Sequence, residues 1–215
     1  MKLLKNENGN TTLFIIGLFG IFTLLFLVVL NFAQVLIDKE RASNNAEQAS
    51  IVATGIIVDS LEEAIYQYDA TLTGTVEEIL DKSLERRLNE AKAALRYDTS
   101  LTSSEVHHKA VNRVLREELA SGNPVLYSIV RSQLNGAMYS LSSEVQSSID
   151  KNDGELAETK IKVFNHNNRV EVETATRYEA HKFDEYFPES SRFVRQKAQG
   201  PTFEIAEVIS WNWEY

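Results

Sequence analysis

The sequence predicts an α+β protein: a single N-terminal transmembrane helix continues into a helical ectodomain, which is followed by a small antiparallel β-sheet. Three observations support this fold class. An uncharged apolar run opens the chain, helical periodicity dominates up to residue 149, and a period of two begins after Gly154. We therefore expect a cytoplasmic tail at 1–12, a transmembrane helix at 13–37, a helical extracytoplasmic region at 38–150 and a β-rich region at 151–215.

The apolar run extends from Leu13 to Leu36 and contains no Lys, Arg, Asp or Glu. About 20 apolar residues in a helix cross roughly 30 Å of hydrocarbon. The alternative is a cleaved signal peptide, whose apolar core is typically only about 7–15 residues and ends in a small-x-small cleavage pattern. This run is longer and no such pattern closes it, so the sequence favours a permanent anchor that contacts membrane lipid.

The charges around the run predict its orientation. Lys2, Lys5 and the free amine precede it, whereas Lys39 and Arg41 follow it beside acidic neighbours. The positive-inside bias, together with the short N-terminal tail, predicts a cell-membrane protein with a cytoplasmic N-terminus and an extracytoplasmic C-terminal domain.

Composition excludes several functions. The chain has 215 residues, a formal net charge of −9 and no cysteine. Because nucleic-acid phosphates demand clustered Lys and Arg, this acidic balance argues against a nucleic-acid partner. The absence of cysteine excludes disulfides, thiolate metal sites and cysteine nucleophiles.

A seam of small side chains follows the apolar run at alternating spacings of four and three. It comprises Ala42, Ala46, Ala49, Ala53 and Ile56, with Ser60 continuing the pattern. Such spacing places the residues on one face of a helix and lets another element approach closely. Two interpretations remain open: packing within the protein's own domain, or lateral assembly into a homo-oligomer.

Three further helices are expected, after a break at 69–75. The first begins near Val76 and runs to Leu95. Thr102 and Glu105 match a capping box at the start of the second, which extends to about Ala120. A Ser-Gly-Asn-Pro sequence at 121–124 stops that helix and starts a third, whose apolar stripe comprises Leu126, Val130, Leu134, Ala137, Leu141, Val145 and Ile149.

Residues 159–164 and 169–178 alternate apolar and polar side chains and predict a hairpin. One register matches apolar with apolar and opposite charges with each other: Val163 with Val170, Ile161 with Val172, Lys162 with Glu171, and Lys160 with Glu173. An aromatic cluster around Pro188 is expected to form a loop and a short capping helix. Gly200-Pro201 predicts a turn, and Phe203–Trp213 a third strand.

No catalytic set is recognisable, and we expect no enzyme activity, cofactor or metal. Glu105 and His108 lie one helical turn apart, but no second pair of ligands supports a metal site. The sequence at 150–155 predicts a plain turn and lacks the spacing of a calcium loop. Trp211 and Trp213, near the C-terminus, are candidates for contact with a partner.

Two segments carry a family resemblance: Glu7-Asn8-Gly9-Asn10-Thr11-Thr12 before the apolar run, and the small, polar helix at 38–50 after it. They resemble the anchor region of the tight-adherence (Tad) pilus-assembly proteins of the TadE/TadG type. The resemblance covers about the first 60 residues. It implies a non-catalytic pilin-like or accessory component of a surface pilus or secretion system, whose partners are other pilus or secretion-platform proteins.

Two departures from that family refine the expectation. Prepilins that are cut after a glycine usually carry Glu at the fifth position beyond it, and counting from Gly9 that position is Phe14. A lasting anchor therefore fits better than a processed subunit. The Asp-x-Ser-x-Ser motif of larger members is absent. The alternatives are a membrane-anchored cell-envelope hydrolase, which predicts a deep polar pocket, and a receptor ectodomain, which the short tail disfavours.

Overall fold

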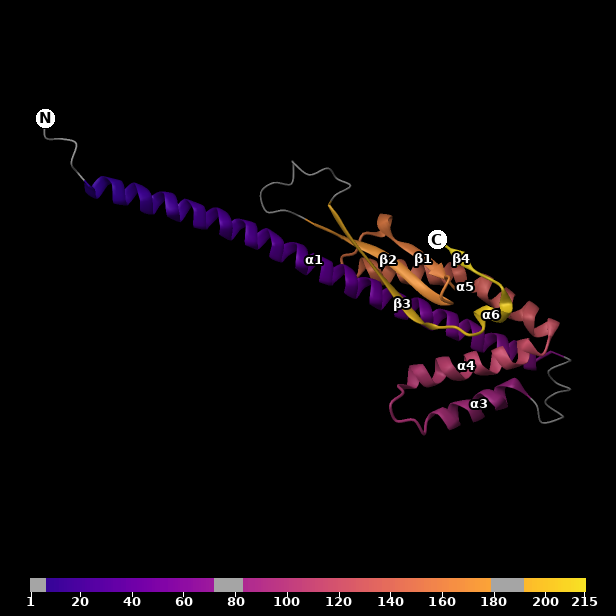
Figure 1. Ribbon diagram of the computed structural model, residues 1–215. Helices are drawn as coiled ribbons and strands as arrows, with labels where there is room; N and C mark the ends of the chain where they lie inside the picture. The colour runs from indigo at the N-terminus through magenta and orange to yellow at the C-terminus, as the bar shows by residue number, and fades with distance from the viewer. Residues whose placement is uncertain (1–6, 72–82, 179–191) are drawn as a thin grey trace, which may run out of the picture.

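The computed structural model describes residues 7–71, 83–178 and 192–215. One helix, α1 (Glu7–Asp69), is 63 residues long and forms the spine of the molecule. Its N-terminal half projects away from the rest of the protein, and its C-terminal half lies within the folded domain (Figure 1). The observed fold class is α+β, as the sequence predicts.

The start of α1 corrects one boundary. The sequence predicts a tail up to residue 12 and a helix from residue 13, but the helix already begins at Glu7. Once a helix is nucleated, each added residue gains one backbone hydrogen bond, so the apolar helix extends into its polar flank. No break separates the apolar run from the seam, because the helix continues unbroken to Asp69.

Three helices pack beside the C-terminal half of α1: α3 (Leu84–Leu95), α4 (Ser103–Ala120) and α5 (Pro124–Asp150). The start of α3 is held from two directions. Ser83 accepts a hydrogen bond from the amide of Arg86, and the Asp69 carboxylate accepts from the amides of Leu84 and Glu85. These acceptors satisfy amide groups that the first turn of a helix leaves unpaired.

The expected boundaries of α4 and α5 are confirmed. The capping box of Thr102 and Glu105 is present, and Asn123 caps α5 with Pro124 in its first turn. Every member of the apolar stripe expected in the last helix is buried. The helix expected from Val76 is observed only from Leu84 onward, because residues 76–82 lie outside the described part of the chain.

A four-stranded antiparallel sheet completes the described fold, in the order β3-β2-β1-β4. A short 3-10 turn, η1 (Leu156–Glu158), precedes it. The strands are β1 (Lys160–Val163), β2 (Arg169–Arg177), β3 (Phe193–Thr202) and β4 (Trp213–Glu214). The expected hairpin register is confirmed at three pairs: Lys160 with Glu173, Ile161 with Val172, and Lys162 with Glu171.

The expected third strand is wrong in its position. The strand that pairs with β2 is β3, and it contains the Gly200-Pro201 sequence that predicts a turn. Pro201 is tolerated because β3 is an edge strand of the sheet, where a missing amide donor costs no ladder bond. The segment after Phe203 instead forms α6 (Ala206–Ile209) and then β4. The aromatic cluster expected around Pro188 lies outside the described residues.

Strands β2 and β3 of the sheet pack onto α1 (Figure 1). At Gly200, a side-chain carbon would collide with the hydroxyl of Thr54 on α1, so the backbones of β3 and α1 approach closely only because this residue is glycine. Apolar side chains of both layers meet in one core, whose largest fully buried members include Tyr68, Phe203 and Ile57.

Candidate membrane and partner surfaces

The first half of α1 presents apolar side chains to its surroundings on all sides. Phe14 is 69 % exposed, Phe22 61 % and Phe32 68 %, so this segment is not the core of the folded domain. Within the described residues, this is the one helix long and apolar enough to cross a membrane, and none of its apolar window is buried in the protein. An exposed apolar helix of this length is stable in lipid and not in water.

A buried carboxylate marks the end of the apolar run. Asp38 is only 2 % exposed. Its carboxylate accepts hydrogen bonds from the side-chain nitrogen Nε2 of Gln34, at 3.2 and 3.3 Å, and lies 3.8 Å from the Arg41 guanidinium. These partners lie one helical turn before and after it, so α1 itself supplies polar neighbours where the chain leaves the apolar segment.

The predicted seam lies inside the folded domain. Ala42, Ala46, Ala49 and Ala53 have no exposed surface. Ile56 is only half-buried, and the next residue, Ile57, is the fully buried one. This part of α1 packs along α5 and against β2 and β3, so the small side chains admit elements of the same chain. Lateral assembly through a second copy stays a prediction.

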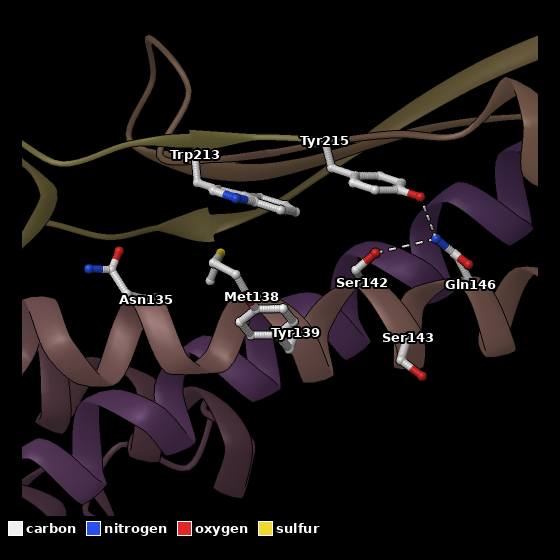
Figure 2. A pocket seen from close by; sticks show the side chains of 8 residues that line it. All are labelled: Asn135, Met138, Tyr139, Ser142, Ser143, Gln146, Trp213 and Tyr215. Atoms are coloured by element: carbon white, nitrogen blue, oxygen red, sulfur yellow. Dashed lines mark hydrogen bonds between the residues drawn. The ribbon is translucent and has the colours of Figure 1, made fainter.

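A groove lies between α5 and the C-terminal strand. It has a volume of about 590 Å³, and Figure 2 shows the side chains that line it. Trp213 and Tyr215 stack with their ring centroids 6.0 Å apart. They form the wall of the groove that faces α5. The Tyr215 hydroxyl accepts a hydrogen bond from Gln146 at 2.9 Å, which holds the strand end over the helix. Tyr139, at 87 % exposure, presents an aromatic ring at the edge of the groove.

The two tryptophans have different environments. The indole nitrogen of Trp211 donates to Asn135 at 3.1 Å, and its ring packs edge-on against Phe164. Trp213, one of the two candidates for partner contact, lines this groove, whereas the sequence alone did not single out Tyr139 and Tyr215. Tyr139 directly follows the buried Met138, and an exposed tyrosine on a helix gives no signal until the C-terminal strand is placed above it.

A buried histidine lies in a second cleft, of about 560 Å³, between α4 and the C-terminal end of β3. His108 is 8 % exposed and bonds through Nε2 to the Asn112 side chain at 3.0 Å. Burial, and then the nearby charges of His107 and Lys109, lower the pKa of His108 to about 4. The imidazole is therefore neutral at pH 7. The Arg116 guanidinium in this cleft is paired with Glu204 at 2.6 Å.

The Glu105 carboxylate is engaged at the N-terminal cap of α4. The Glu105 carboxylate bonds to the amide and hydroxyl of Thr102, both at 2.8 Å. These bonds from Thr102 lower the pKa of Glu105 and fix its carboxylate at the cap. Among the residues that the structure describes, no three His, Asp or Glu side chains gather closely enough to hold a metal ion.

Glu62 organises a polar cluster where α1 meets α3 and α4. Its carboxylate accepts from the Lys92 ammonium at 2.7 Å and from the Tyr66 hydroxyl at 2.9 Å, and His107 lies 3.4 Å away. Burial raises the pKa of Glu62, but the bonds from Lys92 and Tyr66 outweigh it, so the net pKa is lowered. Burial and then the Glu62 bond raise the pKa of Tyr66 to about 12. The cluster ties three helices together.

These features define a class: an apolar helical anchor fused to a compact α+β domain. Residues 9–55 match the family described as putative Flp pilus-assembly TadE/G-like. The match covers the apolar run and most of the seam, and it confirms the resemblance seen in the anchor region. No curated protein and no solved structure shows significant similarity to the chain. The apolar helix and the family match together indicate a membrane-anchored protein with a role related to pilus assembly.

Proposed function

We propose that this protein is a non-enzymatic, pilin-like or accessory component of a Tad-like pilus or secretion assembly, held in the membrane by α1. One observation carries the proposal: the family match at 9–55 falls on a helix whose first half is exposed and apolar and whose second half is the spine of the domain. A helix of this construction fixes a folded domain at a set distance from the membrane.

The accessory role is favoured over that of a processed subunit. Phe14 occupies the position at which processed prepilins usually carry Glu, and it is exposed on the apolar face of α1. The proposed orientation has the N-terminus in the cytoplasm and the domain on the extracytoplasmic side. Lys2 and Lys5 precede the apolar run and have no acidic residue directly beside them, whereas the basic residues after the run do.

The Trp213 groove is the proposed contact with the other assembly proteins. Aromatic side chains are enriched at the centres of protein interfaces, where they bury a large area at a low entropic cost. Within the described residues β4 is also an edge strand of the sheet, and edge strands can pair with a strand of a partner. The His108 cleft gives no support to the hydrolase alternative, because its histidine bonds to Asn112 and its Arg116 pairs with Glu204.

Co-purification after mild crosslinking in the native cells tests this function. Recovery of pilus or secretion-platform proteins with the full-length chain is the expected result, whereas recovery as a lone monomer would count against the proposal.

Two exposed tyrosines provide matched variants for the groove. Tyr139→Ala removes an aromatic ring from the groove, and Tyr97→Ala removes one of similar exposure, 89 %, from the loop between α3 and α4. We expect Tyr139→Ala to reduce the recovery of partners, with Tyr97→Ala remaining at the wild-type level. Equal recovery with both variants would remove the groove from the proposed interface without removing the membrane-anchored role.

A further inference from the structure

A groove of about 400 Å³ lies where the folded domain meets the apolar half of α1. Val28, Asn31, Phe32 and Val35 of α1 form one wall. Tyr178 and Arg192, at the adjoining ends of β2 and β3, form the other with Val194. The two strand ends are joined by a 2.7 Å hydrogen bond from the amide of Tyr178 to the carbonyl of Arg192.

The depth of this groove follows from helix geometry. Its α1 wall, from Val28 to Val35, belongs to the last two turns of the apolar run, which ends at Leu36. The groove therefore lies at the boundary between hydrocarbon and headgroups. Phe32, which is 68 % exposed, lies on the hydrocarbon side, and the polar Asn31 shares its helical turn.

The chemistry of the other wall suits that depth. Tyrosine is enriched at membrane interfaces, because its ring is apolar and its hydroxyl is polar. The arginine guanidinium is planar and can bind two phosphate oxygens at once. Arg177, which is exposed and pairs with Phe193 at the same end of the sheet, adds a second positive charge.

We propose that this groove binds a phospholipid of the adjacent leaflet. The phosphate lies beside Arg192 and the Tyr178 hydroxyl, and an acyl chain lies along Phe32 and Val35. The β2–β3 end of the sheet is then a second membrane contact, which fixes the tilt and rotation of the domain relative to the bilayer. The inference rests on anchoring of α1 in a membrane and is independent of orientation and of pilus partners.

Native mass spectrometry of the full-length protein, released from nanodiscs that contain phosphatidylglycerol, tests the lipid site. We expect the wild type to retain one lipid that Arg192→Gln loses, with bound lipid falling about tenfold, as removal of a charge-assisted pair predicts. Arg131→Gln is the matched control, because Arg131 is an exposed arginine on α5, stacked over Tyr127. Equal lipid retention by wild type and Arg192→Gln, or a second protein copy in place of the lipid, would overturn the proposal.

Depth measurements separate this inference from the anchor itself. The chain has no cysteine, so single spin labels can be placed at Phe22→Cys, Arg177→Cys and Tyr97→Cys without background. We expect the Phe22 label in the hydrocarbon, the Arg177 label at headgroup depth and the Tyr97 label in water. If the Phe22 label is in hydrocarbon while the Arg177 label is as accessible to water as that at Tyr97, the anchor stands and the second contact is refuted.

Discussion

At Gly200 the backbone of β3 lies directly against α1. A methyl group in place of its hydrogen would meet the Thr54 hydroxyl, which itself donates to the carbonyl of Ser50 at 2.7 Å. The Thr54 side chain is short and β-branched, so either its hydroxyl gives up the bond to Ser50 or the sheet shifts to make room.

We therefore expect Gly200→Ala to destabilise the domain by roughly 1–3 kcal/mol, the usual cost of overpacking. Gly136→Ala is the control, because Gly136 is an exposed helical glycine with open space around it and should gain about 0.5–1 kcal/mol. Chemical denaturation in detergent micelles measures both. Removing the hydroxyl with Thr54→Ala should recover part of the loss, and an unchanged stability of Gly200→Ala would contradict the close approach.

His108 makes the stability depend on pH in a defined window. Its pKa is about 4 in the folded protein and near 6.5 when unfolded, so the unfolded chain binds more protons between these values. Stability should therefore fall as the pH is lowered from 6.5 towards 4. Protonation of carboxylates whose pKa is lowered in the folded protein, such as Glu62 and Glu105, also reduces the stability, but only below about pH 4.5.

The variant His108→Gln separates this effect from the carboxylates. We expect a flatter stability profile between pH 6.5 and 4.5, whereas His166→Gln, which alters an exposed histidine of the β1–β2 loop, should retain the wild-type slope. Thermal unfolding followed by circular dichroism at several pH values provides the measurement. Identical slopes for His108→Gln and the wild type would show that His108 is not the group that titrates.

At the scale of the elements, the sequence correctly predicted the helices and strands that bury one face, because a buried face imposes a regular spacing of apolar residues. The β1–β2 register follows from alternation, because slipping by one residue would expose Ile161 and Val172 and separate Lys160 from Glu173. The apolar stripe of α5 follows in the same way. Both patterns are local, and tertiary packing did not override them.

The third strand could not be predicted, because its pattern is not local. Gly200 is the only buried residue of β3, so the strand has no alternation of buried apolar and exposed polar side chains. It is held by β2 and by the fit of Gly200 against α1. The segment from Phe203 has the strand-forming residues. However, His108 packs edge-on against Phe203, and Asn112 accepts from the amide of Ile205, so α4 draws this segment into a turn and short helix.

The seam of α1 gives an element-scale prediction. Ala49 is fully buried in the core, so Ala49→Leu should cost about 1–3 kcal/mol by overpacking. Asn44→Leu, at an exposed position of the same helix, should change stability by less than about 0.5 kcal/mol. Urea denaturation in micelles compares the two. Tolerance of leucine at Ala49 would mean that the close packing of α1 within its domain is wrong.

At the scale of the whole molecule, α1 is both anchor and spine. Its apolar run was readable from the sequence, and so was its family resemblance over about the first 60 residues, which the match at 9–55 confirms. The grooves were not, because each joins segments far apart in the chain: Tyr139 with Trp213, and Val35 with Arg192. The sequence predicted Trp213 as a candidate for partner contact, but the other residues that line its groove could be found only from the fold.

The membrane topology of α1 is the central claim, and thiol labelling in intact cells tests it most directly. Lys5→Cys and Tyr97→Cys place single thiols on either side of the apolar run in a chain that has no cysteine of its own. With a membrane-impermeant maleimide, we expect Tyr97→Cys to be labelled in intact cells and Lys5→Cys only after the membrane is opened. Labelling of Lys5→Cys with protection of Tyr97→Cys, or recovery of both in a soluble fraction, would contradict the account.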